Sequence, residues 1–474
     1  MNNLLEVTNL KITTGSKELL HGITFTIRPG QRLGLIGESG SGKSLTALSI
    51  IGLLPHTLTA SGSIIFDGTE LTSLLERRMQ KLRGRRIAMI FQEPMSALDP
   101  LMKISKQIPG PAHQLLSEVG LDASFASRYP HQLSGGQRQR VMIAMALAQD
   151  PDLLICDEPT TALDATTQAE ILSLIESLVE SRGLSLLFIT HDLGVVARMC
   201  TETLVMNEGS IVESNSTAEL LKNPQHDYTK QLIAASKLGT ATDSTSSTDV
   251  AISLSELTKT YSSTIAVNDI SLDITRGSRW GIVGGSGSGK TTLIKMIAGL
   301  ISPTSGTCRT DGSIQMVFQD PQGSLNPRMA IGNIIAEGLG RYDAAKISEA
   351  LMSVGLDADD AAKYPHQFSG GQRQRISIAR AIIGGPDILL ADEAVSALDV
   401  SVRAQILKLL NQLVEELDLT LVFISHDLGV VKALCTHVAV MHNGEIVEQG
   451  PTSQIWESPT EDYTKQLLAG VHIQ

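Results

Sequence analysis

The sequence is poor in aromatic residues and has no long hydrophobic stretch. Aromatic side chains make up 3% of its 474 residues. No apolar run approaches the roughly 20 residues that a helix needs to cross a bilayer. The opening residues, MNNLLEVTNLKITTG, lack the basic head and apolar core of a signal peptide. We therefore expect a cytosolic protein that meets a membrane only through partner proteins.

The sequence also lacks an excess of basic residues, and its cysteines are not clustered. The 38 Lys and Arg residues are outnumbered by 50 Asp and Glu, and the net charge of −12 argues against a nucleic-acid partner, which attracts basic surfaces. No CxxC pair occurs, so we expect neither a zinc site nor an iron–sulfur site. The cysteines are interpreted as buried free thiols: Cys156, Cys200, Cys308 and Cys435.

What the chain does contain is a repeated loop. Residues 37–44 read GESGSGKS and residues 284–291 read GGSGSGKT, and both fit the P-loop pattern G-x-x-x-x-G-K-[ST]. A single match can arise by chance, but here each follows an apolar strand pattern and precedes a helical one, which indicates two nucleotide sites. The residues expected to hold the nucleotide are Gly37, Glu38, Ser39, Gly40, Ser41, Gly42, Lys43, Ser44, Gly284, Gly285, Ser286, Gly287, Ser288, Gly289, Lys290 and Thr291.

The chemistry of a P-loop explains these residue types. Glycines let the backbone wrap around phosphates, with amide N–H groups facing the anion at the start of a helix. Lys43 and Lys290 are expected to reach the β- and γ-phosphates, and Ser44 and Thr291 to bind Mg²⁺. The sequence thus predicts ATP with Mg²⁺ as the ligand of both loops.

A second repeated motif ends in two carboxylates. The apolar run before Asp157 and Glu158 recurs before Asp392 and Glu393. Such a pair is often only a solvated turn at the end of a strand. Its recurrence in the same context favours catalysis, with Asp157 and Asp392 holding Mg²⁺ and Glu158 and Glu393 polarising the attacking water as general bases.

The spacing of the motifs defines two colinear copies. Ser134, Glu158 and His191 each recur 235 positions later, whereas the P-loop lysines are 247 positions apart. Upstream of the signature the copies therefore differ in length, as surface insertions do. Between them, LGTATDSTSSTD is rich in Ser, Thr and Asp and spans about 20 Å as a random coil. The expected parts are a first domain at 1–237, a flexible linker at 238–249 and a second domain at 250–474.

Strand and helix patterns alternate within each copy. Apolar runs such as DLLICDE, SLLFIT and TLVFIS are typical of buried strands in a parallel sheet. The alternation predicts an α/β fold with a mostly parallel sheet in each of two tandem P-loop domains.

Two further motifs carry a specific family resemblance. LSGGQ at 133–137 and FSGGQ at 368–372 resemble the signature motif of the ATP-binding cassette (ABC) family, and the resemblance covers nearly the whole chain. It implies two ATP-hydrolysing, RecA-like P-loop domains, each with a small antiparallel β subdomain and a helical subdomain. In this family the signature helix of one domain points its N-terminus at the γ-phosphate bound by the other.

The family's remaining motifs also have counterparts. Gln92 and Gln319 match the Q-loop glutamine, which binds at the nucleotide and Mg²⁺ and senses the membrane partner. His191 and His426 match the switch histidine that contacts the γ-phosphate. A lone histidine after a strand is more often structural, but these two share an F-I-[TS]-H-D context. The residues that match the D-loop, which crosses the domain interface, are Asp164 and Asp399.

The head-to-tail arrangement of the family implies two composite sites. Each would join the P-loop, acidic pair and histidine of one copy to the signature of the other. Both copies keep all these residues, so two competent ATPase sites are expected, with ATP joining the halves and hydrolysis releasing them. Site one would take the signature residues Ser369, Gly370, Gly371 and Gln372, and site two would take Ser134, Gly135, Gly136 and Gln137.

Two positions depart from the family pattern. Tyr261 aligns with the aromatic residue that stacks on adenine, but the matching position in the first copy is Thr14. Because stacking is worth on the order of 1 kcal/mol, the first site is expected to bind ATP more weakly. The second departure is Ala394, where the first copy has Pro159, and we expect it to cause only a minor adjustment of a turn.

Several runs resemble the dipeptide, oligopeptide and nickel importer group. They include FQEPMSALDP, FQDPQGSLNP, the YPHQ lead into each signature, and the tails NPQHDYTKQL and SPTEDYTKQL. Two ATPase subunits that are usually separate chains look fused here, as in the glutathione importer. The group's cysteine cluster after the tail has no counterpart before Gln474, so no iron–sulfur centre is expected.

The resemblance implies an importer ATPase at the cytoplasmic face of the inner membrane. Its partners would be two transmembrane permeases, received by the helical subdomains, and an extracytoplasmic substrate-binding protein. Both copies are shortened near this interface, which implies compact contacts with two different permeases. Peptides are the first choice of cargo, followed by nickel or a metal chelate and then by glutathione.

Other ABC classes fit less well. The HDLGVV and DYTKQL runs disfavour an exporter. A soluble tandem protein acting on ribosomes would join its halves by a long charged helix, unlike the short neutral linker at 238–249. DNA-repair ABC ATPases carry zinc cysteines or long coiled-coil insertions, which the sequence lacks.

Overall fold

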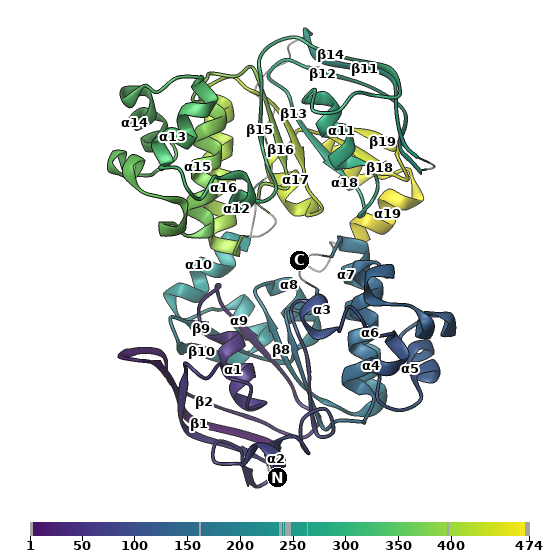
Figure 1. The fold of residues 1–474 in the computed structure, drawn as a ribbon, viewed down its shortest axis with the longest axis vertical. Coiled ribbons are helices and arrows are strands. Elements are labelled where there is room, and N and C mark those ends of the chain that lie inside the picture. Colours follow the sequence, from purple (N-terminus) through teal and green to yellow (C-terminus); the bar gives the residue numbers. More distant parts are fainter. Residues whose placement is uncertain are drawn as a thin grey trace. The chain divides into compact units, whose positions relative to one another are not determined.

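The computed structural model describes most of the chain as two compact units. The first is built mainly from residues 3–236 and the second mainly from residues 248–469 (Figure 1). Most of the predicted linker, 238–249, lies outside the described residues. The described residues are 3–160, 163–236, 239, 241, 248–262, 264–395 and 398–469.

A six-stranded sheet lies at the centre of the first unit. Its strand order is β10-β9-β3-β8-β7-β6, and all neighbours are parallel except β10 and β9. β7 and β8 are buried along their whole length, which is why they read as continuous apolar runs. The strands are β3 (Arg32–Ile36), β6 (Ile87–Ile90), β7 (Leu153–Asp157), β8 (Ser185–Thr190), β9 (Glu202–Asn207) and β10 (Ser210–Ser216).

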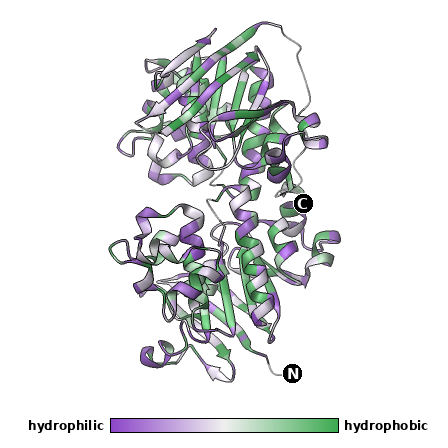
Figure 2. Cartoon of the chain, turned by 90° about the vertical axis from the view of Figure 1, so that its right-hand side faces the viewer, coloured by the Kyte–Doolittle hydropathy of each residue, from purple (hydrophilic) through white to green (hydrophobic). Residues whose placement is uncertain are grey.

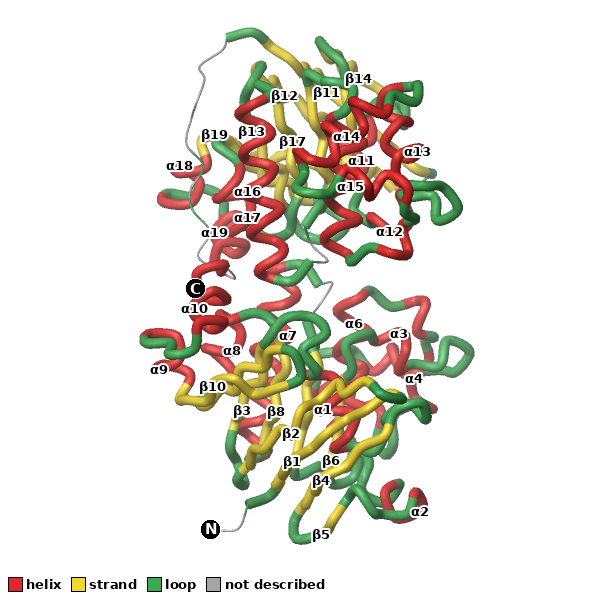
Figure 3. The backbone as a smooth tube through the Cα atoms, turned by 90° about the vertical axis from the view of Figure 1, so that its left-hand side faces the viewer, coloured by secondary structure: helices red, strands yellow, loops and turns green. Residues whose placement is uncertain are grey.

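A smaller antiparallel sheet packs beside it, with strand order β2-β1-β4-β5 (Figure 3). Its strands are β1 (Leu5–Thr14), β2 (Lys17–Ile27), β4 (Thr59–Phe66) and β5 (Thr69–Glu70). The α-helices are α1 (Lys43–Ile50), α2 (Glu76–Met79), α3 (Pro94–Ala97), α4 (Ile104–Gln107), α5 (Ala112–Glu118), α6 (Gly135–Leu147), α7 (Ala165–Arg182), α8 (Leu193–Met199), α9 (Thr217–Lys222) and α10 (Asp227–Ser236). Two 3₁₀ turns are η1 (Ala123–Ser127) and η2 (Pro130–Gln132).

The second unit repeats this plan. Its large sheet has the order β15-β16-β17-β13-β18-β19, which matches that of the first unit strand for strand. The strands are β13 (Arg279–Val283), β15 (Ile314–Val317), β16 (Ile388–Asp392), β17 (Thr420–Ile424), β18 (His437–His442) and β19 (Glu445–Pro451). The small sheet, in the order β12-β11-β14, is formed by β11 (Val250–Tyr261), β12 (Thr264–Thr275) and β14 (Ser305–Thr310).

The helices of the second unit follow the same sequence. They are α11 (Lys290–Ile297), α12 (Pro321–Ser324), α13 (Ile331–Ala336), α14 (Ala344–Ser353), α15 (Gly370–Ile382), α16 (Val400–Glu416), α17 (Leu428–Leu434), α18 (Thr452–Glu457) and α19 (Asp462–Ala469), with 3₁₀ turns η3 (Glu337–Leu339), η4 (Ala358–Ala362) and η5 (Pro365–Gln367). In the described part of this unit nothing corresponds to β5 and α2, so the segment between the P-loop helix and β15 is shorter than its counterpart in the first unit.

Hydrophobic residues, coloured green, concentrate on the central strands of each unit (Figure 2). In the first unit, for example, Phe188 on β8 and Ile36 on β3 are fully buried in one core cluster. These findings confirm the predicted α/β fold, with a mostly parallel sheet, a small antiparallel sheet and a helical region in each copy. Among the described residues, no helix combines the length and the hydropathy that a membrane crossing requires.

Candidate nucleotide-binding sites

Each P-loop connects the central strand of a large sheet to the helix that follows it. The loop at 37–44 joins β3 to α1, and the loop at 284–291 joins β13 to α11. Gly42 and Gly289 cap these helices with φ angles of 103° and 104°. A Cβ atom at Gly289 would lie 2.2 Å from the Ala266 carbonyl oxygen, so only glycine fits there. The predicted strand–loop–helix context of both loops is therefore present.

The P-loop lysines are buried and hydrogen-bonded to their own loops. Lys43 Nζ donates to the carbonyl oxygens of Gly37 and Glu38 at 2.7 and 2.8 Å. Lys290 makes the same pair of bonds in the second loop, at 2.9 and 2.8 Å. Burial lowers the pKa of Lys290, and the nearby charge of Glu393 opposes that shift. Each loop thus folds around an ammonium group, which places a positive charge beside the start of a helix.

The first carboxylate of each acidic pair lies at the end of a buried strand. Ser44 Oγ donates to Asp157 Oδ1 at 3.1 Å. In the second unit, Asp392 Oδ1 is buried and has no hydrogen-bond partner among the described residues. Burial is the main cause that raises the pKa of Asp157 and of Asp392 to about 6. A buried carboxylate oxygen with no donor, next to a threonine-bearing P-loop, suits a hard divalent cation such as Mg²⁺.

The second carboxylate of each pair is held by the predicted glutamine and histidine. Gln92 Nε2 donates to Glu158 Oε2 at 3.1 Å, and His191 Nδ1 lies 3.1 Å from Glu158 Oε1. The second unit repeats this cluster, with Gln319 Nε2 2.8 Å from Glu393 Oε2 and His426 Nδ1 3.4 Å from Glu393 Oε1. The contact with His426 lowers the pKa of Glu393 although burial opposes it. In each unit the structure therefore brings together the Q-loop, acidic-pair and histidine residues.

The backbone of both glutamates is in the left-handed region. Glu158 has φ 47° and Glu393 has φ 46°, values that a residue with a side chain rarely adopts. The N–H of Glu158 donates to the Ile189 carbonyl at 2.9 Å, and the N–H of Glu393 bonds Ile424 in the same way at 3.0 Å. Sequence reasoning missed this conformation, and no local residue pattern signals it.

The turn after the acidic pair has one sequence difference between the copies. Pro159 follows the glutamate in the first copy and the buried Ala394 follows it in the second. Because the glutamate φ angles agree within a degree, the exchange leaves this part of the turn unchanged.

The signature residues form the start of a helix in each unit. Ser134 caps α6, and its Oγ accepts from the Gln137 N–H at 3.3 Å while Gln137 Oε1 accepts from the Ser134 N–H at 3.0 Å. Ser369 and Gln372 form the same capping box on α15. Sequence reasoning missed this role of the two glutamines, although S-G-G-Q fits the S-x-x-Q capping pattern. The pairing of each signature with the P-loop of the other copy stays a prediction.

The two positions compared for adenine stacking are equivalent in the fold. Thr14 ends β1 opposite Lys17, and Tyr261 ends β11 opposite Thr264. The side chain of Tyr261 is 48% exposed, and the Lys259 ammonium lies 5.3 Å from its ring centroid. The second unit therefore offers an aromatic face at this hairpin end, whereas the first offers a threonine. Of the D-loop residues, Asp399 caps α16 and Asp164 precedes α7.

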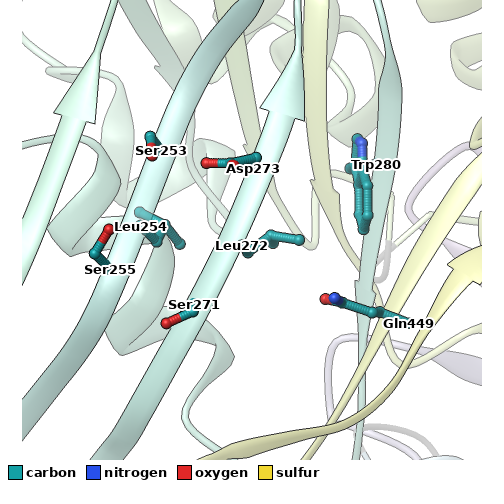
Figure 4. A pocket seen from close by; sticks show the side chains of 8 residues that line it. All are labelled: Ser253, Leu254, Ser255, Ser271, Leu272, Asp273, Trp280 and Gln449. Atoms are coloured by element: carbon teal, nitrogen blue, oxygen red, sulfur yellow. The ribbon is translucent and has the colours of Figure 1, made fainter.

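A separate hollow of about 460 Å³ opens in the second unit (Figure 4). Trp280 of β13 and Gln449 of β19 face the β11–β12 hairpin across it. None of the P-loop, Q-loop or signature residues lines it, so this hollow is not the nucleotide site. The lining residues are Ser253, Leu254, Ser255, Ser271, Leu272, Asp273, Trp280 and Gln449.

The motifs and their geometry agree with the family model described as ABC transporter, which matches residues 20–161 and 267–396. The chain belongs to the ABC transporter family. As an ABC protein it binds ATP and is an ATPase of the transporter class. A second model, described as the C-terminal region of oligopeptide/dipeptide transporters, matches residues 212–247.

The curated relatives of this ABC protein are matched along nearly their whole length. The peptidoglycan transport ATP-binding protein YejF of Agrobacterium fabrum is 44% identical, with 94% of this chain and 92% of the relative covered. The oligopeptide transport ATP-binding protein OppD of Mycobacterium tuberculosis is 36% identical, with 99% and 98% covered. The glutathione import ATP-binding protein GsiA of Salmonella typhimurium is 38% identical, with 96% and 87% covered. These findings confirm the predicted importer group.

A solved structure shows the same tandem fold. The archaeal ribosome recycling factor aABCE1, crystallised with the ribosomal stalk protein aP1, matches with a TM-score of 0.68 at 23% identity, covering 91% of this chain and 88% of that one. At this identity the likeness concerns the fold alone. It confirms two ABC domains in one chain.

Proposed function

We propose that this ABC protein is the ATP-hydrolysing subunit of a peptide importer, with one MgATP site on each P-loop. The ATPase activity in this proposal rests on one repeated cluster. In each copy a glutamine and a histidine contact the carboxylate of a glutamate, and the backbone of that glutamate is left-handed. Glu158 and Glu393 would each accept a proton from the attacking water. His191 and His426, each within 3.4 Å of its glutamate, would keep that carboxylate oriented.

Mg²⁺ would be held by the first carboxylate and the P-loop hydroxyl of each copy. Ser44 and Asp157 already touch at 3.1 Å, and the bare, buried Oδ1 of Asp392 lies at the matching strand end. Gln92 and Gln319 would complete these sites. When bound, the cation would neutralise charge on the phosphates.

The two sites would be composite, as the family resemblance implies. Site one would use the P-loop of the first copy with Ser369, Gly370 and Gly371, and site two the P-loop of the second copy with the equivalent residues 134–136. The N-termini of α15 and α6, which begin directly after the serines of the two signatures, suit an anion such as the γ-phosphate. The proposed domain boundaries remain 1–237, 238–249 and 250–474.

Peptides are the proposed cargo class. The region 212–247 matches the oligopeptide/dipeptide transporter model, and the relatives are named for oligopeptide, glutathione and peptidoglycan transport. Each of these names refers to a peptide or to a molecule that contains one. The proposed partners are two membrane permeases and an extracytoplasmic binding protein, which would place this chain on the cytoplasmic face of the inner membrane.

Uptake in cells that lack this chain tests the proposal. We expect a labelled dipeptide or oligopeptide to accumulate only when the wild-type protein is restored, and not with the Glu158→Gln, Glu393→Gln double variant. Normal peptide uptake with lost nickel accumulation would move the assignment to metal import. Co-purification gives a second arm, in which two hydrophobic permeases support the importer and ribosomal RNA would contradict it.

A further inference from the structure

The repeated tail D-Y-T-K-Q-L has no part in the chemistry described so far, yet in both copies its tyrosine reaches the P-loop. α10 and α19 begin with this tail, close to the end of each unit's chain (Figure 1). The Tyr228 hydroxyl accepts a hydrogen bond from the Glu38 N–H at 3.0 Å, and the Tyr463 hydroxyl accepts one from the Gly285 N–H at 2.8 Å. Glu38 and Gly285 are the second residues of the two P-loops.

The peptide group that the tyrosine holds is also held by the P-loop lysine. In the first unit this group joins Gly37 to Glu38: its N–H bonds Tyr228, and its carbonyl accepts from Lys43 Nζ at 2.7 Å. The group joining Gly284 to Gly285 is held in the same way by Tyr463 and Lys290. Hydrogen bonds on the two ends of one peptide group polarise it and strengthen each other. The tyrosine therefore acts on the same group that positions the lysine.

A carboxylate on the last strand fixes the segment that carries each tyrosine. Glu213 accepts from the N–H groups of Gln225 and His226 at 2.8 and 3.0 Å. Glu448 accepts from the N–H groups of Thr460 and Glu461 at 2.8 and 3.2 Å. Although burial alone would raise the pKa of these glutamates, the donated hydrogen bonds lower it. Both carboxylates therefore remain charged acceptors near neutral pH.

The tail helices are also anchored in the hydrophobic cores. Leu232 and Ile233 of α10 are buried in the first unit, and Leu467 and Leu468 of α19 are buried in the second. The Tyr463 ring in addition lies 3.9 Å, centroid to centroid, from the ring of His442. Each tyrosine hydroxyl is thus carried by an element that is fixed to the sheet.

We propose that Tyr228 and Tyr463 are positioning residues that hold each P-loop ready for phosphate before the nucleotide binds. This inference rests on the proposed nucleotide sites. Phosphate is bound by N–H groups near the start of α1 and α11, whereas the tyrosine holds an N–H at the opposite end of the loop. Tyrosine and phosphate therefore do not compete for donors. Removing the hydroxyl lowers the fraction of loops that are competent to bind, and hence the apparent affinity for MgATP.

The test is the Tyr228→Phe, Tyr463→Phe double variant of the full chain, which keeps both rings. We expect the KM for MgATP to rise about three- to tenfold, as the loss of one hydrogen bond per site predicts, with kcat within about twofold of wild type. Tyr342→Phe is the matched control, because Tyr342 is 60% exposed and its hydroxyl lies beside Gly332 of α13 rather than at a P-loop. A merely structural role would lower stability and leave the KM unchanged.

A second variant tests the link to the last strand. The Glu213→Ala, Glu448→Ala double variant should also raise the KM for MgATP. Combining it with the two tyrosine changes should give a KM no higher than that of the tyrosine double variant, because the glutamates act through the tyrosine contact. An unchanged or lowered KM in the tyrosine variant would overturn the inference. If the wild-type protein fails to bind MgATP at all, the proposed nucleotide sites themselves are wrong. That result differs from an unchanged KM in the tyrosine variant, which contradicts only the role of the tyrosines.

Discussion

Glu158 and Glu393 hold a backbone conformation that costs energy in any residue with a side chain. The left-handed region is disfavoured by about 1–2 kcal/mol for such residues, and glycine would remove that cost. Both copies nevertheless keep glutamate there, with φ angles of 47° and 46°. The strain is retained at a position where the carboxylate meets a glutamine and a histidine, which is expected of a functional site.

The first prediction concerns these two glutamates. Glu158→Gln and Glu393→Gln keep the shape and the glutamine contact but remove the base, so the changed site should slow about a hundredfold or more. Each single variant should therefore retain the turnover of its unchanged site, and the double variant should lose ATP hydrolysis. Steady-state ATPase assays of the purified chain measure this. Full loss in one single variant with no loss in the other would show that only one site is competent.

The second prediction uses the raised pKa of Asp392. Its folded pKa of about 6 exceeds the ordinary value of 3.8. Stability from this group is therefore fully present below the unfolded pKa and is lost as the pH rises through 6. Above about pH 7, Asp392→Asn should stabilise the nucleotide-free second unit by about 1–2 kcal/mol. This is less than the full pKa shift implies, because solvent partly screens the carboxylate. The gain in stability should vanish near pH 4, where the wild-type carboxyl is protonated.

Urea unfolding followed by tryptophan fluorescence measures this effect. Trp280 and Trp456 are the two tryptophans of the chain, and both lie in the second unit, so the signal reports that unit. Asp359→Asn, at an exposed position outside the left-handed region, is the control. A stability gain that does not change with pH would contradict the electrostatic explanation.

At the scale of elements, the signature motif has a structural task besides any contact with nucleotide. Gln137 and Gln372 accept hydrogen bonds from the N–H groups of Ser134 and Ser369, the N-cap residues of α6 and α15. This contact fixes the first turn of each helix. The N–H groups expected to meet the γ-phosphate therefore depend on the glutamine side chain.

The third prediction follows from that cap. Gln372→Ala should lower the free energy of unfolding of the second unit by about 1 kcal/mol, the usual cost of losing a helix cap. Tryptophan fluorescence again isolates this unit, and Gln412→Ala, on the exposed side of α16, is the matched control. Equal stability of the two variants would mean that the capping box contributes nothing.

At the scale of the whole molecule, the open point is which signature serves which P-loop. In the proposed pairing, Lys43 and Ser369 belong to one site, and Lys43 and Ser134 belong to different sites. Combining changes therefore distinguishes pairing between copies from pairing within a copy.

The fourth prediction compares two double variants. Lys43→Ala with Ser369→Arg disables one composite site twice, so its ATPase activity should equal that of Lys43→Ala alone. Lys43→Ala with Ser134→Arg disables both sites and should have none. The measurement is ATP hydrolysis by the full-length chain. The reverse order of activities would show that each copy uses its own signature.

The sequence was sufficient to predict most of the architecture because its signals are local. Glycine spacing and a lysine define a P-loop within eight residues, and buried strands such as β7 and β8 read as unbroken apolar runs. The duplicated motifs predicted two similar units, and both have the same strand order. The identity of the glutamine, histidine and carboxylate residues in each cluster also followed from motif context.

Other features depend on contacts between residues that are distant in the sequence. The Tyr228 hydroxyl meets the Glu38 N–H across 190 positions, and no local pattern near either residue indicates it. The left-handed conformation of Glu158 and the unpaired oxygen of Asp392 likewise arise at the ends of β7 and β16, each of which is paired with a strand on both sides. Local chemistry therefore specifies which residues can bind phosphate and metal, whereas their orientation and pKa are set by burial and by partners that only folding brings within hydrogen-bond distance.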